Sequence, residues 1–201
     1  LMFYKRCEFK ILKNIRVLDF GRYIAGPYCG ALLGDLGAEV IRIERLSGSE
    51  DRFIHPLKEE GGEGAMFMQM NRNKKGMTLN PTKEGAATIV EKLIKSADVV
   101  IANLPPQTLK RMGIDYGTIS KYNPGIILTT VSAFGAGGPY SERVGFDGVG
   151  QAMSGAAYLT GNENEPVKAY SPYIDYGTAS LTAMGTLAAI IERNETGKGQ
   201  I

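Results

Sequence analysis

The sequence predicts an α/β domain in which a mostly parallel sheet is flanked by helices and is followed by a helical segment. Three observations predict this fold class. Short apolar runs alternate with longer segments of helical periodicity, as βαβ units do. Of the 201 residues, 43% are hydrophobic and 22% are charged, which is typical of a globular domain and excludes global disorder. The 26 glycines indicate many tight turns and close backbone approaches.

The first part of the chain predicts a βαβ unit. Residues 15–20 form a short buried strand, residues 28–36 a helix of small residues with Pro27 in its first turn, and residues 39–43 a second strand. A unit of this order implies a right-handed crossover between two parallel strands.

The middle of the chain continues the alternation after a polar, glycine-rich segment at residues 47–64, which we expect to be a loop or lid. Thr82 is the candidate N-cap of the next helix, whose apolar residues fall on one stripe. The strands are expected at residues 77–79, 98–102 and 126–131, and the helices at residues 82–96, 105–112 and 119–122.

The last third of the chain differs in composition, because its predicted helices are rich in small residues. A glycine-rich loop at residues 135–138 precedes a helix at residues 146–159. A long helix at residues 173–193 follows, and Gly197 closes it. There is no internal repeat of fixed period.

Composition and charge exclude several function classes. The net charge of +2 gives no field that indicates nucleic acid or an anionic membrane as a partner. Two cysteines, Cys7 and Cys29, exclude a disulfide scaffold and indicate a reducing compartment. The single histidine, His55, excludes a multi-histidine metal centre, and we expect no bound metal. Neither the N-terminal residues 1–13 nor the apolar residues 181–191 fit a signal peptide or a membrane span, so we expect a cytoplasmic protein.

The loop at residues 21–26 lies after the first strand, which is where open α/β sheets bind ligands. Glu44 ends the second strand, at the place where dinucleotide-binding folds carry a ribose-binding acid. The glycine spacing departs from the Gly-x-Gly-x-x-Gly fingerprint, however, so a turn that requires glycine is the favoured interpretation.

Basic residues recur at loop positions and near the ends of the predicted elements. Most Lys and Arg side chains are solvated surface, but several that converged would form a site for a polyphosphate cofactor. The candidates are Arg42, Arg45, Arg72, Lys74, Lys75, Arg111 and Arg143.

Two residues are candidate nucleophiles. Cys29 lies near a predicted helix start, which lowers a thiol pKa, although a small buried cysteine is the commoner case. Asp175 opens the last helix in apolar and aromatic company between Tyr173 and Tyr176. On pattern alone, a helix N-cap or a first-turn acid is favoured over a nucleophile.

A series of ordered segments carries a family resemblance, although no single one would be specific. They are residues 17–20, 25–27, 36–45, 71–75, 97–100, 109–113, 135–139, 145–147, 151–155 and 187–200. Together they resemble the family III CoA-transferases, which include formyl-CoA transferase, carnitine CoA-transferase and the 2-methylacyl-CoA racemases. The resemblance implies a Rossmann-like fold. Because members of the family are longer, it also implies that residues 1–201 are the N-terminal part of the large CoA-binding domain, with the small domain absent.

The resemblance implies a function and makes Asp175 the catalytic nucleophile. Family members move CoA from an acyl-CoA donor to a carboxylic acid acceptor through aspartyl anhydride and aspartyl-CoA thioester intermediates. Coenzyme A and acyl-CoA are then substrates, no cofactor is permanently bound, and the full-length protein is expected to be an interlocked homodimer. Backbone amides at the helix start near Asp175 are expected to stabilise developing oxyanions.

The resemblance also implies contacts to CoA. Arg45, Asn103 and Arg111 match CoA-contacting positions of formyl-CoA transferase, Ala25 and Leu79 match backbone-contact positions, and Arg143 lies within a residue of a lysine phosphate contact. Ile24 stands where formyl-CoA transferase has glutamine, so formyl-CoA specificity is not supported.

Two alternatives stay open beside the transferase. The racemase branch needs a histidine before the aspartate in its Gly-His-Asp motif, and here the motif is Gly145-Phe146-Asp147. Phenylalanine cannot shuttle a proton, so an acyl-CoA racemase or epimerase is disfavoured. The other alternative is a truncated, non-catalytic CoA-binding fragment.

Overall fold

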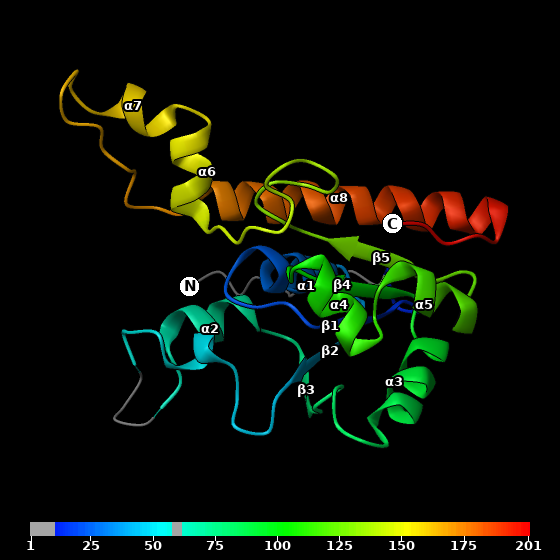
Figure 1. The fold of residues 1–201 in the computed structure, drawn as a ribbon. Helices are drawn as coiled ribbons and strands as arrows, with labels where there is room; N and C mark the ends of the chain where they lie inside the picture. Colours follow the sequence, from blue (N-terminus) through cyan, green and yellow to red (C-terminus); the bar gives the residue numbers. More distant parts are fainter. Residues whose placement is uncertain (1–10, 58–61) are drawn as a thin grey trace, which may run out of the picture.

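A computed structural model describes residues 11–57 and 62–201 of the chain (Figure 1). Cys7 and most of the N-terminal stretch that we expect not to be a signal peptide lie outside the described residues, as do residues 58–61 of the expected loop or lid. Within the described residues, five parallel strands form one sheet in the order β3-β2-β1-β4-β5. The predicted α/β class is therefore confirmed, and the sheet is parallel throughout.

The order of the strands creates a switch point in the sheet. From the central strand the chain first adds β2 and β3 on one side and then adds β4 and β5 on the other. The loops that follow β1 and β4 therefore diverge, and in such sheets this divergence opens a crevice for a ligand at the carboxyl edge. The strands are β1 (Arg16–Asp19), β2 (Glu39–Glu44), β3 (Lys75–Thr78), β4 (Val99–Ala102) and β5 (Ile127–Thr130).

Helices cover both faces of the sheet, since successive strand residues point to opposite faces and both sets are apolar. Val17 and Val99 pack under α1 (Ala25–Asp35) and α8 (Tyr173–Thr196). Leu18 and Val100 belong to the second core, on the opposite face. That core contains residues of α3 (Ala86–Lys95), α4 (Pro106–Met112) and α5 (Tyr116–Tyr122).

Helices α1 and α5 each begin three residues before their predicted start, at Ala25 and Tyr116, and two other predicted helices differ more. The helix expected at residues 82–96 begins at Ala86, because the Asn80 side chain accepts a hydrogen bond from the Thr82 backbone N–H at 3.1 Å and holds a turn there. The helix expected at residues 146–159 is two helices, α6 (Asp147–Met153) and α7 (Ala156–Thr160). Gly155 separates them with a φ of 80°, a left-handed conformation that a helix interior does not allow.

The segment after β2 contains more regular structure than expected. A short 3₁₀ helix, η1 (Glu50–Phe53), lies within the residues expected to form a loop or lid. Helix α2 (Ala65–Met70) follows it and buries Phe67 and Met70. Both elements pack near the loop that follows β1, and this placement matters for the site described below.

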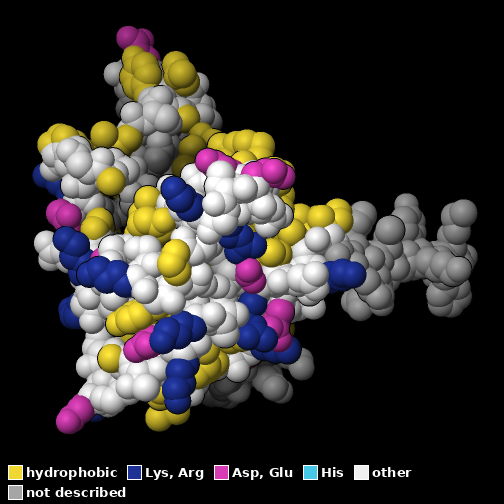
Figure 2. All heavy atoms as spheres, turned by 90° about the vertical axis from the view of Figure 1, so that its right-hand side faces the viewer, with side chains coloured by type: hydrophobic (Ala, Val, Ile, Leu, Met, Phe, Trp, Pro, Cys, Tyr) yellow, Lys and Arg dark blue, Asp and Glu magenta, His cyan; other side chains and the backbone are white. Residues whose placement is uncertain are grey.

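Helix α8 is the one helix of the described residues that is long and apolar enough to cross a bilayer by length and composition, with a mean hydropathy of 1.2. Its inner face packs on α1 and contributes Ala179, Ala183 and Ile190 to the core, as a core helix of an α/β domain does. Its outer face exposes apolar side chains. On the face shown in Figure 2, several hydrophobic side chains gather in the upper part, and others lie lower down among charged side chains of both signs.

Candidate active site

Two adjoining cavities lie at the carboxyl edge of the sheet. The first has a volume of about 300 Å³ and is lined by the loops after β1, β4 and β5 and by the starts of α6 and α8. Of the residues predicted from the sequence, Ala25, Asn103, Arg143 and Asp175 line it. We call it the Asp175 cavity.

The second cavity has a volume of about 460 Å³ and lies beside the ends of β1, β2 and β3 and the helix α4. Arg45, Leu79 and Arg111 line it, so all seven predicted site residues lie on one cavity or the other. We call it the Arg111 cavity. Arg22, Tyr23 and Leu104 line both cavities, which therefore share a wall at the switch point between β1 and β4.

Asp175 is in the first turn of α8, but it does not cap the helix. Pro172 occupies the N-cap position, and the capping carboxylate comes from Asp147 of α6. One oxygen of Asp147 accepts hydrogen bonds from the backbone N–H groups of Ile174 at 2.8 Å and of Asp175 at 3.3 Å. Of the two structural interpretations of Asp175, the first-turn acid is thus confirmed and the N-cap is wrong. Its side chain faces the cavity instead.

The backbone amides at the start of α8 are already engaged. The N–H groups of Ile174 and Asp175 donate to the Asp147 carboxylate. The N–H groups of Tyr173 and Tyr176 donate to backbone carbonyl oxygens of the same turn. The expectation that these amides stabilise an oxyanion is therefore wrong, because a buried carboxylate already occupies the positive end of the helix dipole.

The environment of Asp175 makes its carboxylate more basic than usual. Burial, and secondarily the negative charge of Asp147, raises the pKa of Asp175 from 3.8 to about 6. Within the described residues, no hydrogen bond or ion pair engages its side chain. At neutral pH the group is therefore still mostly ionised, with its lone pairs directed at the cavity rather than at a partner. This is the state that a carboxylate nucleophile requires.

Asp147 is fixed in place by Gln151 on the next turn of α6. The Gln151 side-chain oxygen accepts a hydrogen bond from the Ala169 backbone N–H at 2.8 Å, so its amide nitrogen is the end that donates to Asp147. Asp147 therefore has a structural role, since it caps α8. Phe146, which stands where the racemase motif has histidine, lines the cavity and packs edge-to-face on Tyr23 with ring centroids 5.1 Å apart.

Asn103 has a structural task at the switch point. Its side-chain oxygen accepts from the Arg22 backbone N–H, and its amide nitrogen donates to the Arg22 carbonyl, each at 2.7 Å. The side chain thereby ties the loop after β4 to the loop after β1. Its predicted contact with CoA stays a prediction.

Two of the basic residues considered as candidates for a polyphosphate site have buried side chains. Arg42 lies on β2 and donates to both carboxylate oxygens of Asp51 at 3.0 Å, with 2% of its surface exposed. The Lys74 ammonium pairs with buried Asp19 at 2.7 Å. Neither is free to bind a polyphosphate, because each neutralises a buried carboxylate. The cations that line the two cavities are Arg22, Arg45, Arg111 and Arg143.

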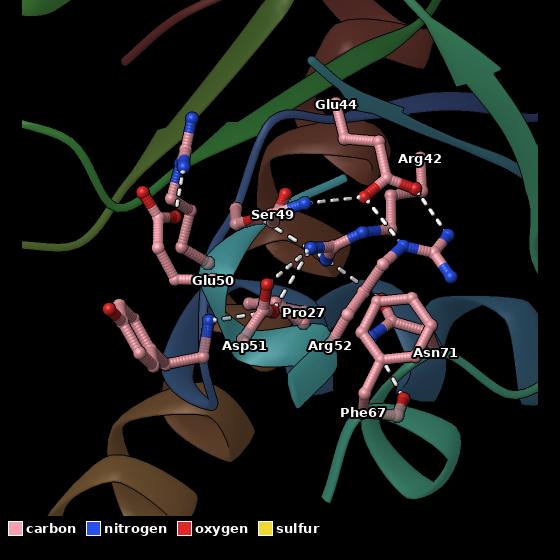
Figure 3. A network of polar contacts seen from close by, with 12 residues as sticks. Pro27, Arg42, Glu44, Ser49, Glu50, Asp51, Arg52, Phe67 and Asn71 are labelled. Atoms are coloured by element: carbon pink, nitrogen blue, oxygen red, sulfur yellow. Dashed lines mark hydrogen bonds and ion pairs between the residues drawn. The ribbon is translucent and has the colours of Figure 1, made fainter. Parts of the chain in front are cut away.

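A charged network beneath the loop after β1 holds that loop in place (Figure 3). Arg42 donates to the Gly21 carbonyl at 3.3 Å, and Asp51 accepts from the Tyr23 backbone N–H at 3.1 Å. Glu44 accepts from the Ser49 backbone N–H at 3.0 Å and pairs with Arg52. Glu44 therefore serves the protein's own backbone and is not a free ribose-binding acid, which supports the earlier preference for a glycine-requiring turn over a dinucleotide site.

The sequence did not single out two of the shared-wall residues, Arg22 and Tyr23, beyond placing their loop at the binding edge. Tyr23 adopts a φ of 61°, which is uncommon for a residue with a side chain. Cys29, by contrast, is fully buried, and burial followed by the charge of Asp19 raises the pKa of its thiol to about 12. It is a core residue rather than a nucleophile.

Comparison with known proteins gives consistent matches along the chain. A family model described as CoA-transferase family III matches residues 12–201. A succinyl-CoA–D-citramalate CoA-transferase of Chloroflexus aurantiacus is 38% identical over 197 residues, covering 94% of this chain and 48% of the relative. A succinyl-CoA:glutarate CoA-transferase of Mus musculus is 36% identical, covering 94% of this chain and 44% of the relative.

The fold comparison agrees with the sequence comparison. The crystal structure of a CAIB/BAIF family protein from Brucella suis superposes with a TM-score of 0.88 at 36% identity, covering 94% of this chain and 51% of that one. The chain thus spans about half the length of the relatives that it matches.

Proposed function

The chain belongs to CoA-transferase family III, and on this premise we propose that its full-length protein moves CoA from an acyl-CoA donor to a carboxylic acid acceptor. One observation carries the proposal. The Asp175 carboxylate opens on a cavity at the switch point of the sheet, with a raised pKa and, within the described residues, without a hydrogen-bonding partner. A carboxylate in this state can attack a thioester.

The proposed reaction exchanges acyl partners in four steps. The Asp175 carboxylate attacks the thioester carbonyl of the donor, which forms a mixed anhydride and releases CoA thiolate. The thiolate attacks the aspartyl carbonyl, which forms an aspartyl-CoA thioester and releases the donor acid. The acceptor carboxylate then displaces the thiolate to form a second anhydride, and the thiolate attacks the acceptor carbonyl. Acceptor acyl-CoA leaves, Asp175 is again a carboxylate, and no net proton is transferred.

The two cavities suit different parts of the CoA molecule. The thioester would lie in the Asp175 cavity, whose wall includes the apolar residues Val144, Phe146 and Ile174, so that water is kept from the anhydride. The nucleotide would lie in the Arg111 cavity, where the guanidinium groups of Arg45 and Arg111 suit phosphate. The pantetheine arm would cross the shared wall. Ala25, Leu79 and Asn103 keep their predicted places along this path.

The substrate class that we propose is dicarboxylic. The names of two relatives pair succinyl-CoA with citramalate or glutarate, acids that carry a further carboxylate. The Asp175 cavity also carries two cations, Arg22 and Arg143, on an otherwise largely apolar wall. Such a wall suits a short carbon chain with an anionic end.

The proposal includes a homodimer of the full-length protein. Exposed apolar side chains on this chain support the proposal, because a second protein surface would cover them. They lie on the outer face of α8, at Leu181, Met184 and Ile191, and on the α6–α7 arm, at Met153 and Leu159. Figure 1 shows that arm extending away from the sheet. Light scattering on the full-length protein tests this part, and a monomer at micromolar concentration would refute it.

Trapping of the intermediate tests the proposed function. Full-length protein incubated with succinyl-CoA and hydroxylamine should form an aspartyl hydroxamate at Asp175, detected by peptide mass spectrometry. Asp175→Asn should form none. An adduct at another residue, or no adduct together with no transfer, would refute the proposal.

Two measurements separate the alternatives. In the full-length protein, solvent deuterium entering the α-carbon of an acyl-CoA without acid exchange would favour the racemase. In residues 1–201 alone, CoA binding by calorimetry without an adduct or turnover would favour the non-catalytic fragment.

A further inference from the structure

Arg143 is separated from the other cations predicted to contact CoA. Arg45 and Arg111 line the Arg111 cavity, whereas Arg143 lines the Asp175 cavity and not the neighbouring one. A phosphate-binding role would place it with the other two guanidinium groups. Its position instead puts it on the cavity that contains the reacting carboxylate.

The second cation of that cavity, Arg22, already has a carboxylate partner. Its guanidinium pairs at 2.7 Å with Glu50 of η1, which also pairs with Arg45 at 2.5 Å. In contrast, no carboxylate within residues 11–57 and 62–201 pairs with Arg143, which stacks on the Tyr140 ring with its guanidinium carbon 4.3 Å from the ring centroid. Stacking uses the flat face of a guanidinium and leaves the N–H groups at its edge free for an anion.

Arg143 is also not the counter-ion of Asp175. Burial and the charge of Asp147 together raise the pKa of Asp175, and no cation opposes them. The guanidinium and the nucleophile thus line one cavity without pairing with each other. A short chain with a carbonyl at one end and a charged group at the other offers a partner to each.

We propose that Arg143 binds the distal carboxylate of a dicarboxylic acyl group in the Asp175 cavity and thereby sets the acid specificity of the enzyme. This inference rests on the proposed CoA-transferase function. The planar guanidinium would hold the distal carboxylate by two parallel hydrogen bonds, and this fixes the acid along the cavity with its other end at Asp175. An acid without a distal carboxylate gains nothing from Arg143, so the residue acts through selectivity rather than through the chemical step.

The test compares matched acids on the full-length protein and its Arg143→Gln variant. Transfer from succinyl-CoA to glutarate is measured beside transfer from butyryl-CoA to pentanoate, whose chains have the same lengths but lack the distal carboxylate. Arg143→Gln should lower kcat/KM for the dicarboxylic pair about 10- to 100-fold, mainly through KM, as expected for loss of a charged hydrogen-bonding partner. The monocarboxylic pair should change less than about twofold, the effect expected where no charged bond is lost.

Three further variants sharpen the result. Arg143→Lys should recover part of the selectivity, because lysine keeps the positive charge but cannot form two parallel hydrogen bonds with a carboxylate. Arg143→Glu should favour an acceptor with a distal ammonium group, such as 5-aminopentanoate. Arg111→Gln serves as the matched control, since loss of a contact in the Arg111 cavity should weaken both acid pairs equally and leave their ratio unchanged.

The outcomes separate this inference from the function on which it rests. Wild-type protein that transfers no CoA and forms no adduct at Asp175 refutes the function and the inference together. Wild-type protein that transfers CoA, with an Arg143→Gln variant whose ratio between the two acid pairs is unchanged, overturns only the inference. An equal loss for both pairs would make Arg143 a general CoA contact. Arg143 is exposed, so the variant is expected to fold, and its unfolding midpoint checks this.

Discussion

Replacing Asp175 by Asn should abolish transfer and at the same time stabilise the fold. The structure holds a carboxylate in a half-buried position beside the negative charge of Asp147, and this raises the pKa of Asp175 from 3.8 to about 6. A tenfold change in proton affinity corresponds to about 1.4 kcal/mol, so a fully enclosed carboxylate with this pKa would cost the fold about 3 kcal/mol. Asp175 is partly open to the cavity, and solvent screening reduces the expected cost to about 1 kcal/mol.

The pH dependence of this stability difference follows from the direction of the pKa. The folded protein binds a proton at Asp175 more tightly than the unfolded chain does. The destabilising charge is therefore fully present above pH 6, declines as the pH falls towards 4, and is absent once the carboxyl is protonated in both states. Asparagine has no charge at any of these pH values. The gain in unfolding free energy of the Asp175→Asn variant over wild type should hence be largest at pH 8 and vanish near pH 4.

Urea and thermal unfolding of the full-length protein measure the effect. At pH 8, Asp175→Asn should raise Tm by about 1–2 °C, the shift that about 1 kcal/mol gives in a protein roughly twice as long as this chain. Glu84→Gln, which removes an exposed carboxylate in the turn before α3, is the control and should leave Tm unchanged. A variant that is less stable than wild type at pH 8, or whose advantage does not change with pH, would refute the reasoning about the Asp175 environment.

Three further predictions concern single side chains. The rate of transfer should rise with pH through about 6 as Asp175 ionises, and Asp147→Asn should move this midpoint to lower pH because a negative neighbour is lost; the pH profile of kcat/KM checks both. Lys74→Met should destabilise the fold by about 3–5 kcal/mol in urea unfolding, because buried Asp19 loses its counter-charge. The exposed Lys75→Met is its control and should cost less than about 1 kcal/mol, as expected for a surface pair. Cys29 should resist iodoacetamide at pH 8 in the native protein and react once urea unfolds it, as peptide mass spectrometry would show; labelling in the native state would contradict the burial and raised pKa of its thiol.

The sheet was predictable from the sequence because its central strands are buried on both faces. Val99–Ala102 is fully buried in the structure, and its continuous apolar run already indicates a parallel strand. Helix α2 was not predicted, since its six residues are too few to show helical periodicity. Contacts with residues outside the helix hold it in place. The guanidinium groups of Arg42 and Arg52 lie 5.0 and 4.1 Å from the centroid of the Phe67 ring. Contacts of that kind are tertiary and leave no local pattern.

The candidate site shows the same division. Residue spacing alone gave Asp175 only as a first-turn or capping acid, and the family resemblance was needed to make it a nucleophile. The charged network was beyond sequence reasoning. In the sequence, Arg42 is indistinguishable from a surface cation. In the structure it forms a buried ion pair with Asp51, which lies in a segment expected to be a polar loop. The burial of a charge depends on its partner, and the partner is set by the tertiary fold.

The buried ion pair of Arg42 and Asp51 is best explained by the loop above it. That loop borders both cavities, so it cannot be fixed by apolar packing on its cavity side, and Tyr23 within it has a φ that costs about 1 kcal/mol for a residue with a side chain. Charged side chains from β2 and η1 instead bind its backbone from beneath, at the Gly21 carbonyl and the Tyr23 N–H. A buried pair adds little to net stability compared with apolar residues of the same size. Its contribution is therefore positional: it holds the wall shared by the two cavities in one conformation, as the proposed path of CoA between the Arg111 and Asp175 cavities requires.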